Sequence, residues 1–301
     1  MTLKRLFPGR VHLDGYIHPD FRAVEETLRD QLRNYPGGAA VCVYHRGEPV
    51  VDLWGGYHDD EGSLWCRDTM APSFSTTKGV AATLLHIYVD RGLIDYDARV
   101  ADYWPEFGQA GKEHITVRQV LSHQSGLYHI RQMIDHVDRM LDWDHMIRAI
   151  EQTWPAHEPG TRTGYHGLTF GFLVGEIIQR VTGEKFSDLV QREIADPLEL
   201  DGLFIGAPEY AISRAATLLF PESTRRLSQT SFGQRLEVNA ARLSKFLQRL
   251  GVDSDLVSIF DALAPRGISD FDFGSPESLR VAIPAGNGLF TARSLARMYA
   301  M

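Results

Sequence analysis

A serine and a lysine three residues apart could supply the nucleophile and the base of an acyl-transfer reaction. They open and close the tetrapeptide Ser75-Thr76-Thr77-Lys78. Residues three apart lie on one face of a helix, so the Lys78 amine can reach the Ser75 hydroxyl and accept its proton. The amine must be neutral for this, and burial lowers the pKa of a lysine because it disfavours the ammonium form. The spacing therefore predicts a serine nucleophile that is activated without histidine.

The residues after Lys78 are apolar enough to bury that amine. Residues 79–85 carry no charged side chain, and Gly92 then supplies a residue type that commonly ends helices. We expect a buried helix over residues 75–91, whose free N-terminal N–H groups face an oxyanion forming at Ser75. A Ser-x-x-Lys string also arises by chance, so this apolar context is what gives it weight.

Hydrophobic periodicity predicts the elements that surround this helix. Residues 20–34 have the spacing of an amphipathic surface helix, and residues 38–43 and 50–57 have the pattern of a β-hairpin. Further helices are predicted over residues 117–122, 142–151, 168–181 and 239–250, from Phe186 onward, and after an N-cap at Thr291. Residues 286–288, Gly-Asn-Gly, predict a tight turn because they lack the spacing of a phosphate-binding loop.

The composition is that of an ordinary globular protein, with 44% hydrophobic and 23% charged residues among 301. The formal net charge is -8 and basic residues do not cluster, which argues against nucleic acid as a partner. Cys42 and Cys66 are too few for a disulfide framework, and no apolar stretch has the length of a membrane span. We expect a soluble, cytoplasmic protein that does not interact with a membrane.

Four segments occur in the order found in a known family. They are residues 52–56 (Asp-Leu-Trp-Gly-Gly), 74–79 around Ser75, 115–127, and 159–161 (Pro-Gly-Thr) followed by Tyr165. Together they resemble the serine β-lactamase-like superfamily, particularly family VIII carboxylesterases and class C β-lactamases. The resemblance implies an α+β fold like that of β-lactamases and penicillin-binding proteins, with an antiparallel sheet flanked by helices. It also implies an α/β body from residues 1–74 and 200–301 and a mostly helical domain over residues 75–199, with the nucleophile helix at the boundary.

The same resemblance assigns roles to individual residues. In the family, a tyrosine that opens a Tyr-x-Asn motif acts with the lysine as general base, and Tyr165 matches that tyrosine. Gly167 stands where the motif has asparagine, so the side-chain amide that helps relatives to hold a substrate amide is absent. This implies a carboxylesterase for short acyl esters, with a Ser75 acyl-enzyme, Lys78 and Tyr165 as base, and no cofactor. His166 is left outside this catalytic set.

The chain departs from the family on its C-terminal side. Relatives carry a Lys-Thr-Gly, His-x-Gly or Trp-Gly-Gly motif on a late strand, with further strands and a terminal helix around it. No such segment follows Thr291 here, so we expect the C-terminal strands to be missing and the hairpin at residues 38–57 to lack its sheet partners. A separate C-terminal segment or a homo-oligomer would then complete the sheet.

Other functions remain open at this point. The same site could belong to a β-lactamase, a D-amino-acid peptidase or an acyltransferase, because a fold does not fix its chemistry. A truncated, non-catalytic relative that serves in binding or assembly is an alternative of a different class. Several histidines lie between residues 114 and 166, but none has the spacing of a known metal motif, so no metal site is expected. The Gly-x-Ser-x-Gly signature of α/β-hydrolases is absent.

Overall fold

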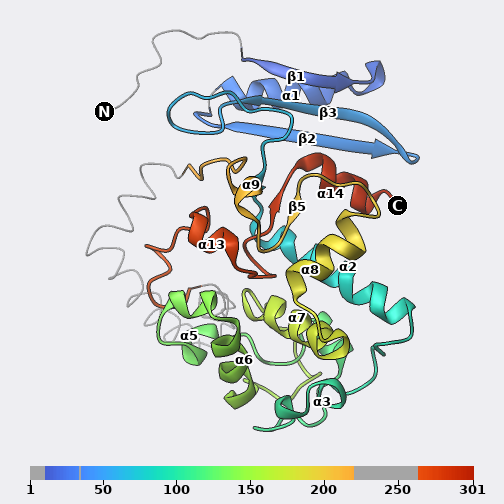
Figure 1. The fold of residues 1–301 in the computed structure, drawn as a ribbon, viewed down its shortest axis with the longest axis vertical. Helices are drawn as coiled ribbons and strands as arrows, with labels where there is room; N and C mark the ends of the chain where they lie inside the picture. Colours follow the sequence, from blue (N-terminus) through green and yellow to red (C-terminus); the bar gives the residue numbers. More distant parts are fainter. Residues whose placement is uncertain (1–10, 34, 220–263) are drawn as a thin grey trace, which may run out of the picture.

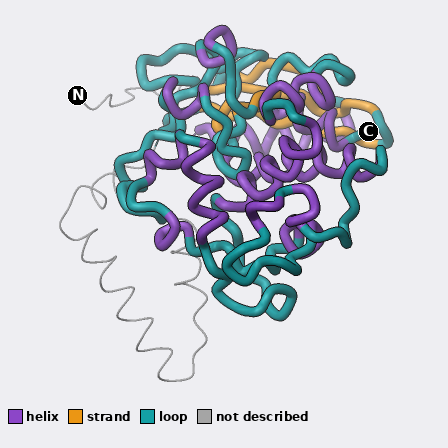
Figure 2. Tube along the Cα trace, turned by 60° about the horizontal axis from the view of Figure 1, so that its bottom comes forward, coloured by secondary structure: helices purple, strands orange, loops and turns teal. Residues whose placement is uncertain are grey.

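The computed structural model describes residues 11–33, 35–219 and 264–301. A three-stranded antiparallel sheet lies at one end of the molecule, and helices make up most of the remainder (Figure 1). Figure 2 shows the same division, with the strands gathered in the upper part of the view and helices through most of the remainder. The helix predicted over residues 239–250 lies outside the described residues.

The N-terminal sheet consists of β1 (Leu13–Ile17), β2 (Gly38–His45) and β3 (Glu48–Gly56) in the order β1-β3-β2. Strands β2 and β3 form the predicted hairpin. The expectation that this hairpin lacks sheet partners is wrong on one side, because β1 pairs antiparallel with β3. Sequence analysis missed β1 because Asp14-Gly15 at its centre has the composition of a turn.

Helices cover both faces of this sheet. Helix α1 (Arg22–Arg33) follows a short 3-10 turn, η1 (Pro19–Phe21), and matches the predicted amphipathic helix. Its buried face packs with apolar residues of β3, and this small core contains Leu28, Leu32, Val50, Val51 and Leu53. Helix α14 (Ala292–Tyr299) lies along β2 on the opposite face, and the Thr291 hydroxyl caps it by accepting the Ser294 N–H, as predicted.

Helix α2 (Thr77–Asp90) runs through the centre of the molecule and packs against α7 (Thr169–Thr182). The chain enters it through a 3-10 turn, η2 (Phe74–Thr76), so the α-helix begins two residues after Ser75. Helix α7 ends at the predicted stop, where Gly183 adopts a left-handed conformation with φ 73°.

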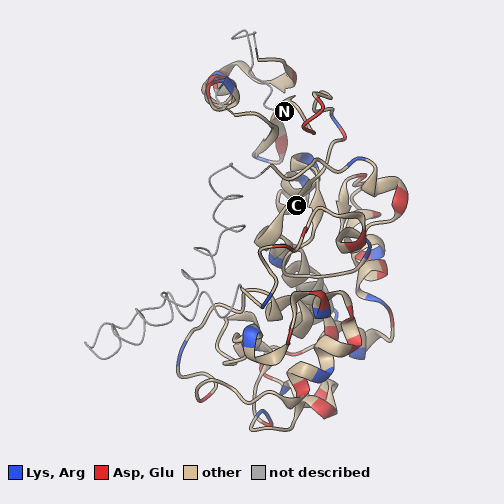
Figure 3. Cartoon of the chain, turned by 90° about the vertical axis from the view of Figure 1, so that its left-hand side faces the viewer, with Lys and Arg blue, Asp and Glu red and all other residues tan. Residues whose placement is uncertain are grey.

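Most of the remaining elements surround α2 and α7 and share one large apolar core, whereas α9 and α13 contribute to a smaller second core. In chain order they are α3 (Val100–Tyr103), η3 (Pro105–Phe107), α4 (Val117–Leu121), α5 (Ile130–Met133), η4 (Val137–Leu141), α6 (Trp143–Gln152), α8 (Phe186–Val190), the π-turn η5 (Gln191–Ala195), α9 (Glu209–Ile212) and α13 (Pro276–Arg280). Acidic and basic residues are interspersed along the chain in the helical region (Figure 3).

A second, very small sheet brings three distant segments together beside Ser75. It contains β4 (Ala71–Pro72), β5 (Leu203–Phe204) and β6 (Leu289–Phe290) in the order β4-β6-β5. Because β4 leads directly into the η2 turn, its pairing with β6 fixes the approach of the chain to the start of α2.

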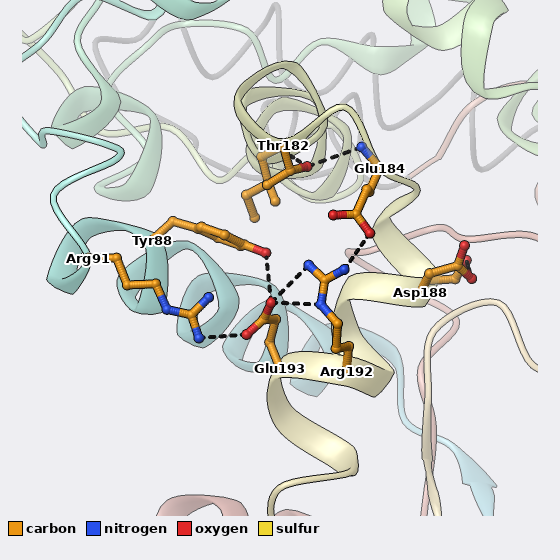
Figure 4. Close-up of polar contacts among 9 residues, drawn as sticks. Tyr88, Arg91, Thr182, Glu184, Asp188, Arg192 and Glu193 are labelled. Atoms are coloured by element: carbon orange, nitrogen blue, oxygen red, sulfur yellow. Dashed lines mark hydrogen bonds and ion pairs between the residues drawn. The ribbon is translucent and has the colours of Figure 1, made fainter.

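An ion-pair network anchors the far end of α2. Arg91 donates to Glu193 at 2.6 Å, and the Tyr88 hydroxyl donates to the same carboxylate at 3.3 Å (Figure 4). Arg192 bonds both Glu193 and Glu184, so the network ties α2 to the α8-η5 region. The hydrogen bonds from Arg91 and Arg192 lower the pKa of the Glu193 carboxyl and keep it ionised.

Within the described ranges, no helix combines the length and the apolar character that crossing a membrane requires.

Candidate active site

Ser75 lies in a backbone turn whose flanking residues, Ser73 and Thr77, both form hydrogen bonds with the backbone of Gly288. The Ser73 N–H donates to the Gly288 carbonyl at 2.8 Å, and the Gly288 N–H donates to the Thr77 hydroxyl at 2.9 Å. Glycine allows this close approach, because an added Cβ would meet Phe290 Cζ at 2.2 Å and Thr77 Oγ1 at 2.6 Å. Phe74, immediately before Ser75, has a φ of 44°, a strained conformation for a bulky residue. The turn is therefore held rigidly by its neighbours.

The structure brings the three predicted site residues together. Lys78 Nζ lies 3.2 Å from Ser75 Oγ, and the Tyr165 hydroxyl lies 2.8 Å from the same oxygen. Lys78 Nζ is also 5.0 Å from the centre of the Tyr165 ring. Ser75 is exposed, whereas Lys78 is only 8% exposed. A hydroxyl that solvent can reach thus lies against an amine that is almost completely buried.

Backbone carbonyls complete the surroundings of the Lys78 amine. Nζ donates to the carbonyl oxygens of Gly167 at 2.6 Å and of Ala285 at 2.9 Å. Burial lowers the pKa of Lys78 to about 8. A neutral amine has two N–H donors, which the two carbonyls use, and one lone pair, which remains for the hydroxyl proton of Ser75. The geometry therefore suits lysine as a proton acceptor.

Sequence analysis did not identify Ala285, because it contributes a backbone oxygen, which any residue type can supply. The predicted turn at residues 286–288 is displaced toward the N-terminus: the Gly286 N–H donates to the Ile283 carbonyl at 2.9 Å, so the turn spans residues 283–286 and carries Ala285. Asn287, which is buried, fixes the turn by accepting the Ile283 N–H at 2.9 Å. In α7, Gly171 allows the close approach, because a Cβ there would meet Ala285 N at 2.4 Å.

Two histidines lie behind Tyr165. The His123 ring packs 5.2 Å from the Tyr165 ring, and its Nδ1 accepts the backbone N–H of His166 at 3.2 Å. Burial, with a smaller contribution from the Lys78 charge, lowers the pKa of His123 to about 4. His166 is fully buried and turned into the fold, with no direct contact to Ser75. Sequence analysis did not identify His123 as a neighbour of the site.

Aromatic side chains form an apolar surface next to Ser75, beginning with Phe74, the residue before it. The Phe74 side chain is 41% exposed, and its ring packs edge-on against Phe273 at 5.6 Å. Phe273 in turn packs against Phe271 at 4.8 Å. Because Phe273 is almost two hundred residues from Phe74, the contact between their rings could not be read from spacing.

Among the residues that the structure describes, no three or more His, Cys, Asp or Glu side chains are grouped so that they could hold a metal ion. The polar groups that contact Ser75 Oγ are an amine and a phenol, which can both donate and accept protons.

Comparison with known proteins identifies the family. Residues 24–301 match the family model described as Beta-lactamase. The chain is 38% identical over 275 residues to the esterase/beta-lactamase LipL of Mycobacterium tuberculosis. The matched region covers 87% of this chain and 58% of that protein. The chain therefore spans less than two thirds of the length of this relative.

Solved structures agree with this assignment. A family VIII carboxylesterase is 32% identical with a TM-score of 0.77, covering 96% of this chain and 70% of that one. A penicillin-binding protein homologue from Caulobacter crescentus is 32% identical with a TM-score of 0.73, covering 95% and 70%. The predicted superfamily and fold class are confirmed. The chain belongs to the β-lactamase family.

Proposed function

We propose that the protein is a serine hydrolase, a carboxylesterase that cleaves short acyl esters through an acyl-enzyme on Ser75. The observation that carries this proposal is the contact of one exposed hydroxyl with a buried amine at 3.2 Å and a phenol at 2.8 Å. This is the arrangement expected of a nucleophile with an adjacent base. Ser75, Lys78 and Tyr165 are the proposed catalytic residues.

In the proposed reaction, Ser75 Oγ attacks the ester carbonyl carbon while its proton passes to the Lys78 and Tyr165 pair. The backbone N–H of Ser75, near the positive end of α2, stabilises the oxyanion. The bond to the alcohol oxygen then breaks, and the pair returns the proton to that leaving oxygen. Water attacks the resulting acyl-serine, gives a proton to the same pair, and releases the acid when Ser75 Oγ is protonated again.

Gly167 supports an ester substrate. Its carbonyl oxygen is already used by the Lys78 amine at 2.6 Å, and it has no side chain to hold a substrate amide. An ester has no amide N–H that needs an acceptor, so it loses less than an amide would at this site.

A β-lactamase is the second candidate within the same site. The printed name of LipL joins esterase and β-lactamase, and both reactions proceed through acylation of a serine. D-amino-acid peptidase and acyltransferase activities use the same chemistry. A non-catalytic binding or assembly role is the alternative of another class, and the intact contacts around Ser75 weigh against it.

A further segment is proposed to complete the sheet. In the described residues, β2 is an edge strand, and the relatives named above are longer than this chain. An unpaired edge is a template for another strand. We propose a separate C-terminal segment as its occupant. Fast amide exchange in β2 that becomes protected when such a segment is added would support this. Protection in the chain alone that depends on protein concentration would instead indicate a second copy.

A cytoplasmic location is proposed from the cysteines. Cys42 and Cys66 are both free thiols, and free thiols persist best in a reducing compartment. Fractionation of cells that produce the protein would test this, and recovery from the medium or the envelope would contradict it.

Parallel steady-state assays test the proposed activity. The substrates are nitrophenyl esters of two to eight carbons and a chromogenic cephalosporin, and the enzymes are wild type and Ser75→Ala. We expect ester hydrolysis by wild type that falls by at least about 10³-fold in Ser75→Ala. Cephalosporin turnover above ester turnover would favour the second candidate, and equal activity of both enzymes would exclude Ser75 as the nucleophile.

A further inference from the structure

His166 is fully buried beside the exposed Tyr165 and uses both of its ring nitrogens. Nε2 lies 2.7 Å from the Ser125 hydroxyl and 3.1 Å from the backbone nitrogen of Leu127. Nδ1 lies 2.7 Å from the Gly164 carbonyl oxygen. One side chain thus joins the loop after α4 to the loop that carries Tyr165.

The partners of His166 determine its tautomer. The Gly164 carbonyl can only accept, so Nδ1 must carry the proton. The Leu127 N–H can only donate, so Nε2 must be unprotonated, and the Ser125 hydroxyl can then donate to it as well. Burial, and the neighbouring His123, His157 and His129, lower the pKa of His166 to about 3 and favour this neutral form. The ring has no free position for acid or base chemistry.

The backbone on either side of Tyr165 is held by hydrogen bonds to His123. The Gly164 N–H donates to the His123 carbonyl at 2.9 Å, and the His166 N–H donates to His123 Nδ1 at 3.2 Å. The His123 ring supports the tyrosine ring from behind. Tyr165 itself is 36% exposed, and its hydroxyl bonds Ser75, so most of its restraint comes from these neighbours.

We propose that His166 is a positioning residue, which holds the Tyr165 hydroxyl at Ser75 through its hydrogen bonds to Ser125, Leu127 and Gly164. This inference rests on the proposed function, because it assigns to Tyr165 a role in that reaction. It adds a residue that does not touch the reacting atoms but sets the distance between two that do.

A double-mutant cycle between His166→Asn and Tyr165→Phe tests the proposal with a nitrophenyl ester. The asparagine amide keeps a donor for Gly164 and removes the acceptor for Ser125 and Leu127. We expect His166→Asn to lower kcat by about 10- to 100-fold with KM changed less than about threefold. In the Tyr165→Phe background the same change should cost less than about threefold, because both act through one hydroxyl. Equal losses in both backgrounds would overturn the proposal.

The control is Glu176→Gln, which disturbs a buried group remote from Ser75. Glu176 is 6% exposed and accepts from Trp143 at 2.8 Å and Arg180 at 2.6 Å. This variant should lower the melting temperature with kcat per folded molecule unchanged. If His166→Asn behaves in the same way, its role is structural only and the proposal is overturned.

A second readout separates this proposal from the proposed function. With ring-labelled tyrosine, the NMR signal of Tyr165 is assigned by its loss in Tyr165→Phe. We expect His166→Asn to shift or broaden that signal and Glu176→Gln to leave it in place. An unmoved signal contradicts positioning, even in a protein without esterase activity. A moved signal in an inactive wild type supports positioning and refutes the esterase.

Discussion

The Lys78 amine lies 2.9 Å from the carbonyl oxygen of Ala285, a residue 207 positions further along the chain. The partner at Gly167 is 89 positions away. Three segments that are remote in sequence therefore create the surroundings that lower the pKa of this lysine. The lowered pKa is a property of the tertiary structure and not of the tetrapeptide alone.

The first prediction concerns pH. Lys78 has a pKa of about 8, and only its neutral form can accept the Ser75 proton. The kcat/KM for a nitrophenyl ester should therefore rise with pH and level off above about 8, and it should fall about tenfold per pH unit well below that value. Initial rates from pH 5.5 to 9.5 measure this, with background hydrolysis subtracted. A profile that is flat between pH 6 and 9 would rule out Lys78 as the titrating base.

Lys78→Met should lower kcat by about 10²- to 10⁴-fold, because it removes the proton acceptor. Lys112→Met is the matched control. Lys112 is also buried, its pKa is also lowered to about 8 by burial, and its Nζ also donates to two carbonyls, those of Glu151 and Thr153 at 2.8 Å. Both variants should lose stability, but the control should keep its kcat and pH profile. A comparable loss of kcat in both would mean that burial, and not catalysis, explains the effect.

Tyr165→Phe separates the phenol from the fold. The hydroxyl bonds only the exposed Ser75 oxygen among the described residues, so the free energy of unfolding should change by less than about 0.5 kcal/mol. The kcat should fall by about 10²-fold or more, since the proton route to the leaving alcohol is interrupted. Urea titration and steady-state kinetics on the same samples give both values. An enzyme with full activity would show that the lysine acts without this residue.

Sequence reasoning succeeded where local pattern decides structure. The apolar run after Lys78, the glycine stop at Gly183 and the hydroxyl cap at Thr291 each act within one helix, and all three are present. It failed at β1, where Asp14-Gly15 resembles a turn and only pairing with β3 makes a strand.

The residues of the site also fall into those that the sequence predicts and those that it does not. The proximity of Ser75 and Lys78 follows from helical spacing, and Tyr165 came from family resemblance. The carbonyl of Ala285 and the ring of Phe273 could not be predicted, because each reaches the site through long-range packing of a segment with no distinctive composition.

The aromatic surface beside Ser75 predicts substrate preference. Phe273 supports the exposed Phe74 ring at 5.6 Å, so Phe273→Ala should weaken binding of the longer acyl chains. We expect kcat/KM for an eight-carbon ester to fall by about 10-fold or more, and for a two-carbon ester by less than about threefold, since burial of each CH₂ contributes about 0.8 kcal/mol. Phe273→Leu, which keeps apolar volume, is the control. Equal effects on all chain lengths would place the acyl chain elsewhere.

The ion pair between Asp52 and Arg293 predicts a loss of stability. Arg293 donates to both oxygens of Asp52, at 2.7 and 3.1 Å, and each side chain is about one-fifth exposed. Asp52→Asn leaves the guanidinium without its countercharge between β3 and α14, which should cost about 1–3 kcal/mol. Thermal unfolding measures this, with the exposed Asp97→Asn as control because its pair with Arg118 lies in solvent. An unchanged melting temperature for Asp52→Asn would show that α14 does not depend on this contact.

The most direct test of the central claim is covalent labelling of Ser75. A fluorophosphonate probe added to the folded protein, followed by intact-mass and peptide mass spectrometry, reports whether this hydroxyl is nucleophilic. The account predicts one adduct per chain, located on Ser75, formed much more slowly in Lys78→Met and absent in Ser75→Ala. No adduct on wild type whose circular dichroism shows it to be folded, or an adduct that persists in Ser75→Ala, would contradict it.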